Sequence, residues 1–421
     1  MSEELRTIRP IKSVNAEIQL PPSKSYTNRA LIVAALADGT SIIHNPSRSN
    51  DSMLLIQAAR KFGIEIKEEQ DRLEVIGSNG KLKSPSQEIF VGNAGTTMRF
   101  LASFACLADG ETTLTGDEQM NKRPIKDLLE TLKANGIKCT SQNGFPPVKI
   151  LGGNFNGGKI NIDASVSSQF VSSILLASPY AKRPVILHIN GDINSMPYVD
   201  MTLHVMRSFG ANIETIDTKI FKIDNQQKYI GHEFEIESDA TSASYFLAAA
   251  AITNGYIKIC GLSTESLQGD IQFISVLSDM GCSVIKHQDC IEMRGGKLHG
   301  IEVDMNAMLD CVPTLAVVAA FAKGNTVIKN IRQLRYKETD RISAIATELT
   351  KIGAKIELVD NELIIHPQPL HGAVIETYND HRIAMSFAIA GLQVDGIKIK
   401  NPMCVTKSFP NFWEEFKKLE V

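Results

Sequence analysis

The sequence predicts an α/β chain of two similar domains, each made of three repeated helix/strand units around buried helices. Amphipathic stretches that end in glycine recur at intervals of 71–74 residues, and nearly apolar stretches recur between them with a comparable period. The chain of 421 residues is also too long for one compact hydrophobic core, so two domains are the default expectation.

Five amphipathic stretches form the first series, and each is followed by a short run of alternating residues. Apolar residues at helical spacing predict a helix, a glycine after the last turn predicts its cap, and alternation predicts a strand. The glycines of this series are Gly63, Gly136, Gly210, Gly281 and Gly353. Each unit is therefore expected to cover an outer face with one amphipathic helix.

Six helices that are apolar on nearly all sides form the second series, as in SYFLAAAAITNG. A helix without a polar face must be surrounded by protein, so these helices are expected to be buried. Each is followed by a strand, and the third reaches its strand through Lys182 and Arg183 instead of glycine. The glycines of this series are Gly39, Gly110, Gly255, Gly324 and Gly396.

Six units divide naturally into three and three, and the polar segment 224–232 separates the third from the fourth. We therefore expect an N-terminal domain of residues 19–230 with repeats one to three. Residues 1–18 and 231–421 are expected to form a C-terminal domain with repeats four to six. Chance is a weak alternative, because two independent glycine series agree on the period.

Composition narrows the possible functions. A net charge of −3 does not indicate nucleic-acid binding, which is typical of strongly basic domains. The start MSEELRTIRP lacks the apolar core of a secretory signal, and the longest apolar runs are far shorter than the roughly 20 residues that span a bilayer. Seven cysteines without CxxC spacing predict free thiols in a reducing cytoplasm rather than disulfides or zinc.

Polar signals concentrate just before the apolar helices. They are PPSKSYTNRA, GNAGTTMRF, SVSSQF, DATSASY, MLDCVPT and YNDHRIA. Free N–H groups at a helix N-terminus attract anions. Ser, Thr and Asp are also ordinary N-caps, but capping does not require Lys24, Arg29, Arg99 and Arg382 beside the caps. Repetition of this arrangement favours anion-binding sites.

The remaining motifs argue against a nucleotide-binding fold and contribute further charged candidate residues. GNAGTTMR lacks the GK[ST] ending of a phosphate loop, and no GxGxxG follows a strand, so neither a nucleoside triphosphatase nor a dinucleotide fold is expected. LRYKETDRISAI is the densest charged motif. It is either part of a site or a solvated helix start on which Lys337 and Arg341 share a face. KRPI and TKSFP add Arg123 and Lys407.

Nine motifs in chain order resemble the 5-enolpyruvylshikimate-3-phosphate synthases, a family of enolpyruvyl transferases. They are PPSKSYTNRA, GNAGTTMRF, KRPI, SVSSQF, SMPYVDMT, VDMNAMLDCVPTLA, YKETDR, YNDHR and TKSFP. The resemblance covers nearly the whole chain and implies an inside-out α/β barrel in each domain, with closure on substrate. It also suggests a monomer, and the chemistry of the implied reaction needs no metal or redox cofactor.

The implied reaction transfers the enolpyruvyl group of phosphoenolpyruvate to the 5-hydroxyl of 3-phosphoshikimate, in chorismate and aromatic amino-acid biosynthesis. By resemblance, 3-phosphoshikimate is bound by Lys24, Ser25, Arg29, Ser167, Ser168, Gln169, Ser195, Tyr198, Asp310 and Lys337. Phosphoenolpyruvate is bound by Lys24, Gly95, Arg123, Gln169, Arg341, Arg382 and Lys407. Asp310 and Glu338 are the implied acid–base residues, with Lys24 assisting and His381 nearby.

Chemical reasoning agrees with that pair of carboxylates. The 5-hydroxyl of 3-phosphoshikimate must lose a proton as it attacks C2 of the enolpyruvyl group. The C3 methylene of the enolpyruvyl group must gain a proton, so two proton-transfer groups are needed. We expect Asp310 to take the hydroxyl proton and Glu338 to protonate C3. Arginine suits bidentate binding of the carboxylate and phosphate.

Three positions depart from the family pattern. Thr97 and Phe100 stand where Ala and Pro are common, beside Gly95, which leaves sensitivity to the family's inhibitor glyphosate open. Gln333 stands where a substrate-contacting Asn is common, so it also stays open whether Gln333 contacts the substrate.

Two alternatives remain. A related transferase acts on UDP-N-acetylglucosamine and has a reactive cysteine in a glycine-rich loop, whereas Cys106 lies in an apolar helix and Cys139 in a strand-like run without glycines. A non-catalytic anion-binding protein is the other class, and it would lack Asp310 or Glu338, both of which are present.

Overall fold

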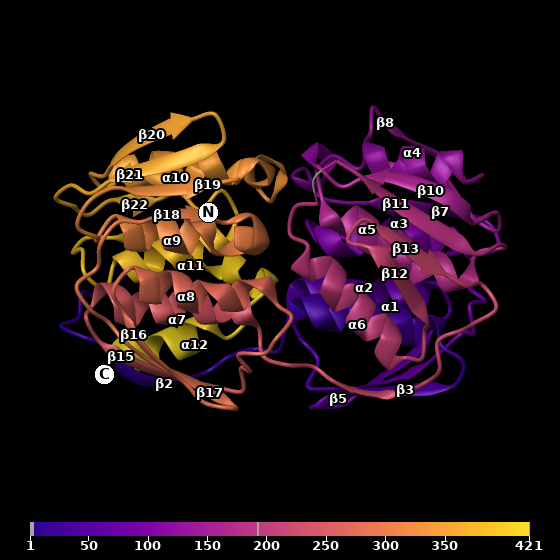
Figure 1. Cartoon of the computed structure of the whole chain (residues 1–421), viewed down its shortest axis with the longest axis horizontal. Helices are drawn as coiled ribbons and strands as arrows, with labels where there is room; N and C mark the ends of the chain where they lie inside the picture. Colours follow the sequence, from indigo (N-terminus) through magenta and orange to yellow (C-terminus); the bar gives the residue numbers. More distant parts are fainter. Residues whose placement is uncertain (1–3, 192, 421) are drawn as a thin grey trace. The chain divides into compact units, whose positions relative to one another are not determined.

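The computed structural model describes residues 4–191 and 193–420, and these form two compact units (Figure 1). The N-terminal unit is Pro22–Glu237, and the C-terminal unit combines the residues up to Pro21 with those from Ser238 onward. The boundaries expected after residues 18 and 230 lie a few residues earlier. Strand β14 (Glu233–Glu235) pairs with β3 (Thr40–His44), which keeps this stretch in the N-terminal unit.

Three inner helices form the centre of the N-terminal unit and contact one another. They are α1 (Lys24–Leu36), α3 (Gly95–Ala105) and α5 (Ser168–Ala177). Nearly every residue of the three is buried, as expected for helices without a polar face. The amphipathic helices are α2 (Asn50–Lys61), α4 (Lys126–Ala134) and α6 (Pro197–Ser208). Short 3-10 helices follow as η1 (Met120–Lys122) and η2 (Ser178–Tyr180).

Three four-stranded mixed sheets complete the described part of this unit, in the orders β14-β3-β5-β4, β6-β7-β9-β8 and β10-β11-β13-β12. In each sheet the first pair is parallel and the other two pairs are antiparallel. The remaining strands are β4 (Glu65–Glu68), β5 (Arg72–Ile76), β6 (Ile89–Phe90), β7 (Glu111–Thr115), β8 (Lys138–Gln142), β9 (Phe145–Leu151), β10 (Gly158–Asp163), β11 (Val185–Asn190), β12 (Ile213–Asp217) and β13 (Ile220–Ile223).

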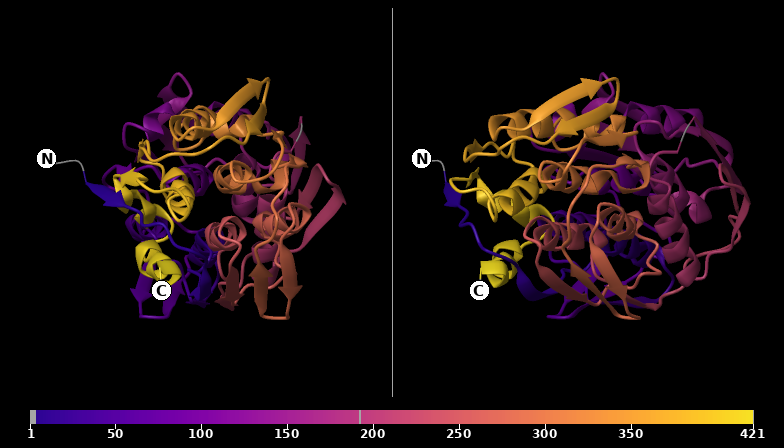
Figure 2. Two further views of the ribbon diagram at one scale, coloured as in Figure 1. Left: turned by 90° about the vertical axis from the view of Figure 1, so that its left-hand side faces the viewer. Right: turned by 60° about the vertical axis from the view of Figure 1, so that its left-hand side comes forward.

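The C-terminal unit repeats this plan with inner helices that again contact one another, and Figure 2 shows them nearly end-on with β-hairpins at the periphery of the unit. The inner helices are α7 (Ala240–Ile252), α9 (Val312–Ala319) and α11 (His381–Ala390). The others are α8 (Phe273–Asp279), α10 (Arg341–Lys351) and α12 (Phe412–Lys417). Its 3-10 helices are η3 (Gly269–Gln272), η4 (Asn306–Cys311), η5 (Arg332–Tyr336), η6 (Pro402–Lys407) and η7 (Lys418–Glu420).

Two N-terminal strands enter the sheets of the C-terminal unit. Strand β2 (Asn15–Gln19) pairs in parallel with β15 (Tyr256–Cys260), and β1 (Leu5–Thr7) pairs antiparallel with β23 (Lys398–Lys400). The sheet orders are β16-β17-β15-β2, β18-β19-β21-β20 and β1-β23-β22. The other strands are β16 (Ser283–Lys286), β17 (Cys290–Arg294), β18 (Glu302–Asp304), β19 (Thr326–Lys329), β20 (Lys355–Val359), β21 (Glu362–His366) and β22 (Val374–Ile375).

The predicted glycine series is confirmed. All five glycines that follow the amphipathic helices have positive φ, from +86° at Gly210 to +110° at Gly281, the conformation that a left-handed helix cap requires. A strand follows each of them. None of the helices in the described residues has both the length and the hydropathy that crossing a membrane would require.

Candidate functional site

Part of the predicted site lies at the N-termini of the inner helices. Ser23, Ser167, Asp239 and Asp380 each cap one of these helices, because each side chain accepts a backbone N–H of the first turn. The capping interpretation is therefore correct for these four. The cationic side chains beside the caps have other partners, and these partners define the site.

Lys24 begins α1 and forms an ion pair with Asp51 in the first turn of α2, with 2.8 Å between Nζ and Oδ2. Both side chains are largely buried, at 13% and 5% exposed. Thr97 donates from Oγ1 to the backbone oxygen of Asp51 over 3.3 Å. One of the two unusual residues of the GNAGTTMRF motif therefore supports the residue that orients Lys24.

Arg29 is 1% exposed and joins α1 to α6. Its guanidinium donates to Thr202 Oγ1 over 2.8 Å and to the backbone oxygens of Ser25 and Tyr198 over 2.8 and 2.9 Å. Burial lowers the pKa of this guanidinium to about 10. Phe100, the second unusual residue, lies under it with 5.3 Å between Cζ and the ring centroid. Arg29 thus fixes the positions of Ser25 and Tyr198.

Gly95 lies against two guanidinium groups. A Cβ atom at this position would lie 2.5 Å from Arg99 Nη1 and 2.6 Å from Arg123 Nη2, so any other residue would require these guanidinium groups to shift. Arg123 also donates from Nη1 to the backbone oxygen and to Oδ1 of Asn93, both over 3.1 Å. The glycine therefore lets two cations approach the start of α3.

The start of α5 supplies three more predicted residues. Ser167 caps the helix by accepting the N–H of Gln169 over 3.2 Å, and Ser168 is 5% exposed. Gln169 donates from Nε2 to Thr96 Oγ1 over 3.1 Å, which links α5 to α3. Ser195 is buried with φ +58° just before α6. In the N-terminal unit, Arg29 therefore contacts two other predicted residues, Ser25 and Tyr198. The side chains of Lys24 and Gln169 instead contact Asp51 and Thr96, which were not predicted.

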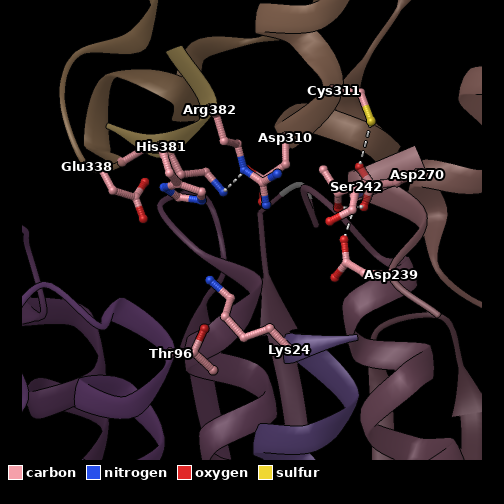
Figure 3. Close-up of polar contacts among 12 residues, drawn as sticks. Lys24, Thr96, Asp239, Ser242, Asp270, Asp310, Cys311, Glu338, His381 and Arg382 are labelled. Carbon is pink, nitrogen blue, oxygen red and sulfur yellow. Dashed lines mark hydrogen bonds and ion pairs between the residues drawn. The ribbon is translucent and has the colours of Figure 1, made fainter. Parts of the chain in front are cut away.

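Asp310 is the centre of the predicted site in the C-terminal unit, and Figure 3 shows it beside Arg382. Its Oδ2 lies 2.7 Å from Arg382 Nη2, and its Oδ1 lies 2.9 Å from Arg341 Nη1 and 3.2 Å from Lys337 Nζ. One carboxylate thus faces three cations that the sequence motifs LRYKETDR and YNDHR supply.

Arg341 is 1% exposed and binds three carboxylates. Arg341 donates hydrogen bonds to Asp380 from Nε over 2.8 Å and from Nη2 over 3.1 Å. Its Nη2 also donates to Glu338 Oε2 over 2.7 Å, in addition to the ion pair with Asp310. The alternative that KETDR is a solvated helix start is therefore wrong for Arg341.

The remaining predicted residues lie around Glu338 and Asp380. Lys407 Nζ is 3.7 Å from Glu338 Oε1. His381 is buried, with Nδ1 3.6 Å from Asp380 Oδ1. Gln333, whose contact was left open, is buried in η5. Every predicted residue of the C-terminal unit thus belongs to one connected cluster or borders it.

Local backbone geometry places Asp380 and Arg382. Tyr378 and Asn379 both adopt left-handed backbone with φ +54°, so the chain turns sharply before α11. Glu348, which is fully buried, accepts from Tyr378 Oη over 2.8 Å and from the Glu376 N–H over 3.1 Å. These bonds hold the strained turn.

The charges of the cluster set its protonation states. Burial alone would raise the pKa of Asp310, but Arg382, Lys337 and Arg341 hold it well below its usual range. Burial lowers the pKa of Lys337. Burial would also lower the pKa of Arg341, but Asp380, Glu338 and Asp310 raise it above its usual range. Asp310 is therefore a carboxylate, and a weak base while all three cations face it.

Sequence reasoning missed Asp51 and left Asp380 without a role. Asp51 stands in the first turn of an amphipathic helix, where an acid is ordinary because it favours the helix dipole. Only the tertiary contact with Lys24 distinguishes it. Asp380 was visible in YNDHR, but its double contact with Arg341 joins segments 39 residues apart.

Cys106 and Cys139, the cysteines considered as reactive thiols, lie in environments that disfavour that role. Cys106 and Cys139 are buried free thiols, and burial raises the pKa of both. This environment opposes the thiolate that a reactive cysteine needs. Within residues 4–191 and 193–420, no group of three or more His, Cys, Asp or Glu side chains could hold a metal ion.

Comparison with known proteins places these motifs in one family. The model of the family EPSP synthase (3-phosphoshikimate 1-carboxyvinyltransferase) matches residues 8–416. The chain is 44% identical to a 3-phosphoshikimate 1-carboxyvinyltransferase of Xenorhabdus nematophila over 420 residues, which are 98% of each chain. It is 42% identical to that of Vibrio campbellii over 423 residues, 99% of each.

The fold agrees with a solved structure of the same family. An EPSP synthase from Acinetobacter baumannii superposes with a TM-score of 0.82 at 28% identity, covering 99% of this chain and 98% of the other. The family match, the relatives above 40% identity and this superposition extend over nearly the whole length. The chain therefore belongs to the EPSP synthase (3-phosphoshikimate 1-carboxyvinyltransferase) family.

Proposed function

We propose that the chain transfers the enolpyruvyl group of phosphoenolpyruvate to the 5-hydroxyl of 3-phosphoshikimate, releasing phosphate, in chorismate and aromatic amino-acid biosynthesis. The observation that carries this proposal is the cluster in which Asp310 and Glu338 share Arg341. It combines two carboxylates for proton transfer with cations for anionic substrates. Membership of the EPSP synthase family supports the choice of substrates.

The residues of the N-terminal unit are assigned mainly to 3-phosphoshikimate. Its contacts are Lys24, Ser25, Arg29, Ser167, Ser168, Gln169, Ser195 and Tyr198, together with Asp310 and Lys337. The contacts of Arg29 support a role in holding Ser25 and Tyr198 in place, and the N-terminus of α5 offers backbone N–H groups to a phosphate.

Phosphoenolpyruvate is assigned to Lys24, Gly95, Arg123, Gln169, Arg341, Arg382 and Lys407. Five of these residues are Lys or Arg, whose positive charges suit its carboxylate and phosphate. The two guanidinium groups packed on Gly95 support its place in this set.

The chemistry needs Asp310 to become a better base than it is beside three cations. When an anionic substrate takes over Arg382 and Arg341, the carboxylate loses part of that stabilisation and its pKa rises. Asp310 then takes the proton of the 5-hydroxyl as the oxygen attacks C2. Glu338, with Lys24 assisting and His381 nearby, delivers a proton to C3. In the elimination that follows, the C2–O bond to phosphate breaks and Glu338, now a carboxylate, takes a proton back from C3, which restores the C2–C3 double bond.

We also assign the finer fold and setting to this family pattern. Each unit is an inside-out α/β barrel domain with three-fold pseudosymmetry, and the enzyme is a cytoplasmic monomer. The three four-stranded sheets of the N-terminal unit share one pairing pattern, a parallel pair followed by two antiparallel pairs, which supports the pseudosymmetry.

Phosphate release tests the proposal. Purified protein is mixed with phosphoenolpyruvate and 3-phosphoshikimate, and in parallel with phosphoenolpyruvate and UDP-N-acetylglucosamine. We expect phosphate release in the mixture that contains 3-phosphoshikimate and none in the mixture that contains UDP-N-acetylglucosamine. No release, or equal release with the nucleotide sugar, overturns the proposal.

A further inference from the structure

Asp270 is a second buried carboxyl group close to the proposed base. It lies in η3, which packs against η4, the segment that carries Asp310. Only 3% of Asp270 is exposed. None of the roles assigned above uses it, although burying an acid is costly unless its surroundings compensate.

Two hydrogen bonds hold the Asp270 carboxyl group. Cys311 donates from Sγ to Oδ1 over 3.2 Å, and Thr241 donates from Oγ1 to Oδ2 over 3.0 Å. Cys311 directly follows Asp310 and is fully buried, and Thr241 lies in the first turn of α7. Figure 3 shows the contact between Asp270 and Cys311 on one side of Asp310, and Arg382 on the opposite side of Asp310. Asp270 thus ties the end of η4 to the start of α7.

Charged groups face Asp270 from the elements around it. Burial raises the pKa of Asp270 to about 6, with contributions from the negative charges of Asp310 and Asp239. Arg382 and the hydrogen bond from Cys311 act in the opposite direction. Repulsion between two carboxylates is mutual, so an ionised Asp270 makes Asp310 a stronger base.

We propose that Asp270 is a positioning residue for Asp310, which fixes η4 through Cys311 and supplies a negative charge that strengthens Asp310 as the proton acceptor. The inference rests on the proposed function, in which Asp310 takes the hydroxyl proton. At neutral pH Asp270 offsets part of the positive charge of Arg382, Arg341 and Lys337. Below about pH 6 it takes up a proton, and this support is lost.

The pH profile of kcat for Asp270→Asn tests the charge. Asparagine has the same shape, and its amide oxygen still accepts from Cys311. We expect kcat at neutral pH to fall on the order of tenfold, with little change in KM for either substrate. The acid limb should move to lower pH, because Asp310 loses a neighbouring negative charge.

Cys311→Ala is a matched variant with the opposite expected shift. It removes a hydrogen bond that favours ionised Asp270, so Asp270 keeps its proton to higher pH and the acid limb moves upward. Ser244→Ala is the packing control. Its hydroxyl is buried in the same helix as Thr241 and donates to the Thr241 backbone oxygen over 2.6 Å, and we expect its profile to match the wild type.

The outcomes separate this inference from the proposed function. Wild-type turnover is measured first, and its absence overturns both. If the wild type is active while Asp270→Asn keeps the wild-type kcat and profile, only the inference is overturned. Equal shifts in Ser244→Ala identify a packing effect and also overturn it. If Asp270→Asn does not fold, Cys311→Ala decides, and an unshifted acid limb in that variant contradicts the inference.

Discussion

Asp310 and Arg382 form an ion pair of 2.7 Å between Oδ2 and Nη2. The two residues are 72 positions apart, which is one repeat period. Asp310 lies in η4, directly before the inner helix α9, and Arg382 lies in the first turn of the next inner helix, α11. The ion pair therefore joins equivalent places in two repeats. An anionic substrate at Arg382 competes with Asp310 for the same guanidinium, so binding and activation of the base are coupled.

Replacing Asp310 by Ala should remove the proton acceptor. We expect kcat to fall by about 100-fold or more, while the circular dichroism spectrum stays that of the wild type. Asp289→Ala, at an exposed acid of the same unit, is the control and should keep full turnover. Substantial phosphate release by Asp310→Ala would contradict the acid–base assignment.

Gly95→Ala should weaken the binding of phosphoenolpyruvate. The new methyl group would meet Arg99 and Arg123 at 2.5–2.6 Å, so at least one guanidinium must move. We expect KM for phosphoenolpyruvate to rise on the order of tenfold, the loss of about one hydrogen bond to a charged group. KM for 3-phosphoshikimate should change less. Gly110→Ala, whose methyl group would meet the Ser84 hydroxyl at 2.9 Å and no guanidinium group, is the matched control.

Asp51→Asn should release Lys24 from its ion pair. The ammonium then loses the negative charge of the carboxylate 2.8 Å away, and its position becomes less defined. Because Lys24 is assigned to both substrates, we expect both KM values to rise several-fold, the usual effect of losing about 1 kcal/mol of orientation. Steady-state kinetics measure this, with exposed Asp71→Asn as the control. Unchanged KM values would remove Asp51 from the site.

Glu348→Gln tests the turn before α11. The substitution disturbs a buried carboxylate that accepts from Tyr378, the Glu376 N–H and Lys351. We expect the free energy of unfolding to fall by about 1–3 kcal/mol, and the affinity for phosphoenolpyruvate to fall because Asp380 and Arg382 follow this turn. Urea unfolding and KM are the measurements. Exposed Glu414→Gln should change neither.

The stability of Asp270→Asn should depend on pH in a defined direction. The folded-state pKa of Asp270 is raised to about 6, above the unfolded value of roughly 3.9. The wild type therefore carries the cost of a buried charge above about pH 6 and loses that cost as the pH falls toward 4. We expect the variant to be more stable than the wild type at pH 7–8, with the difference shrinking at pH 5. Thermal unfolding across this range measures it, and a difference that is constant with pH would contradict the assignment.

The repeat plan could be predicted because its signals are local. A glycine after a helical stretch, such as Gly281, by itself indicates a left-handed backbone at that position. An apolar helix such as α7 by itself indicates that it is buried. Strands of two or three residues, such as β6 and β22, carry no such signal. Their pairing with β7 and β23 depends on partners elsewhere in the chain.

The site could be predicted where charge stands out from its surroundings. Lys24 and Arg382 were visible because capping does not need them. Asp51 and Asp270 were not, since one sits where a helix favours an acid and the other follows a glycine in an irregular segment. Their roles arise only from side chains that folding brings to them.

The strands β1 and β2 have a consequence for protein synthesis. They leave the ribosome before Pro22–Glu237, and their partners β23 and β15 leave only after that whole segment. At about 5–20 residues per second, the wait for β15 lasts on the order of 10–50 s. The N-terminal unit is one continuous segment and can complete its core during that interval, while two strands remain without their sheet. A circular permutant that carries residues 4–21 after residue 420 would deliver them beside their partners and shorten this exposure.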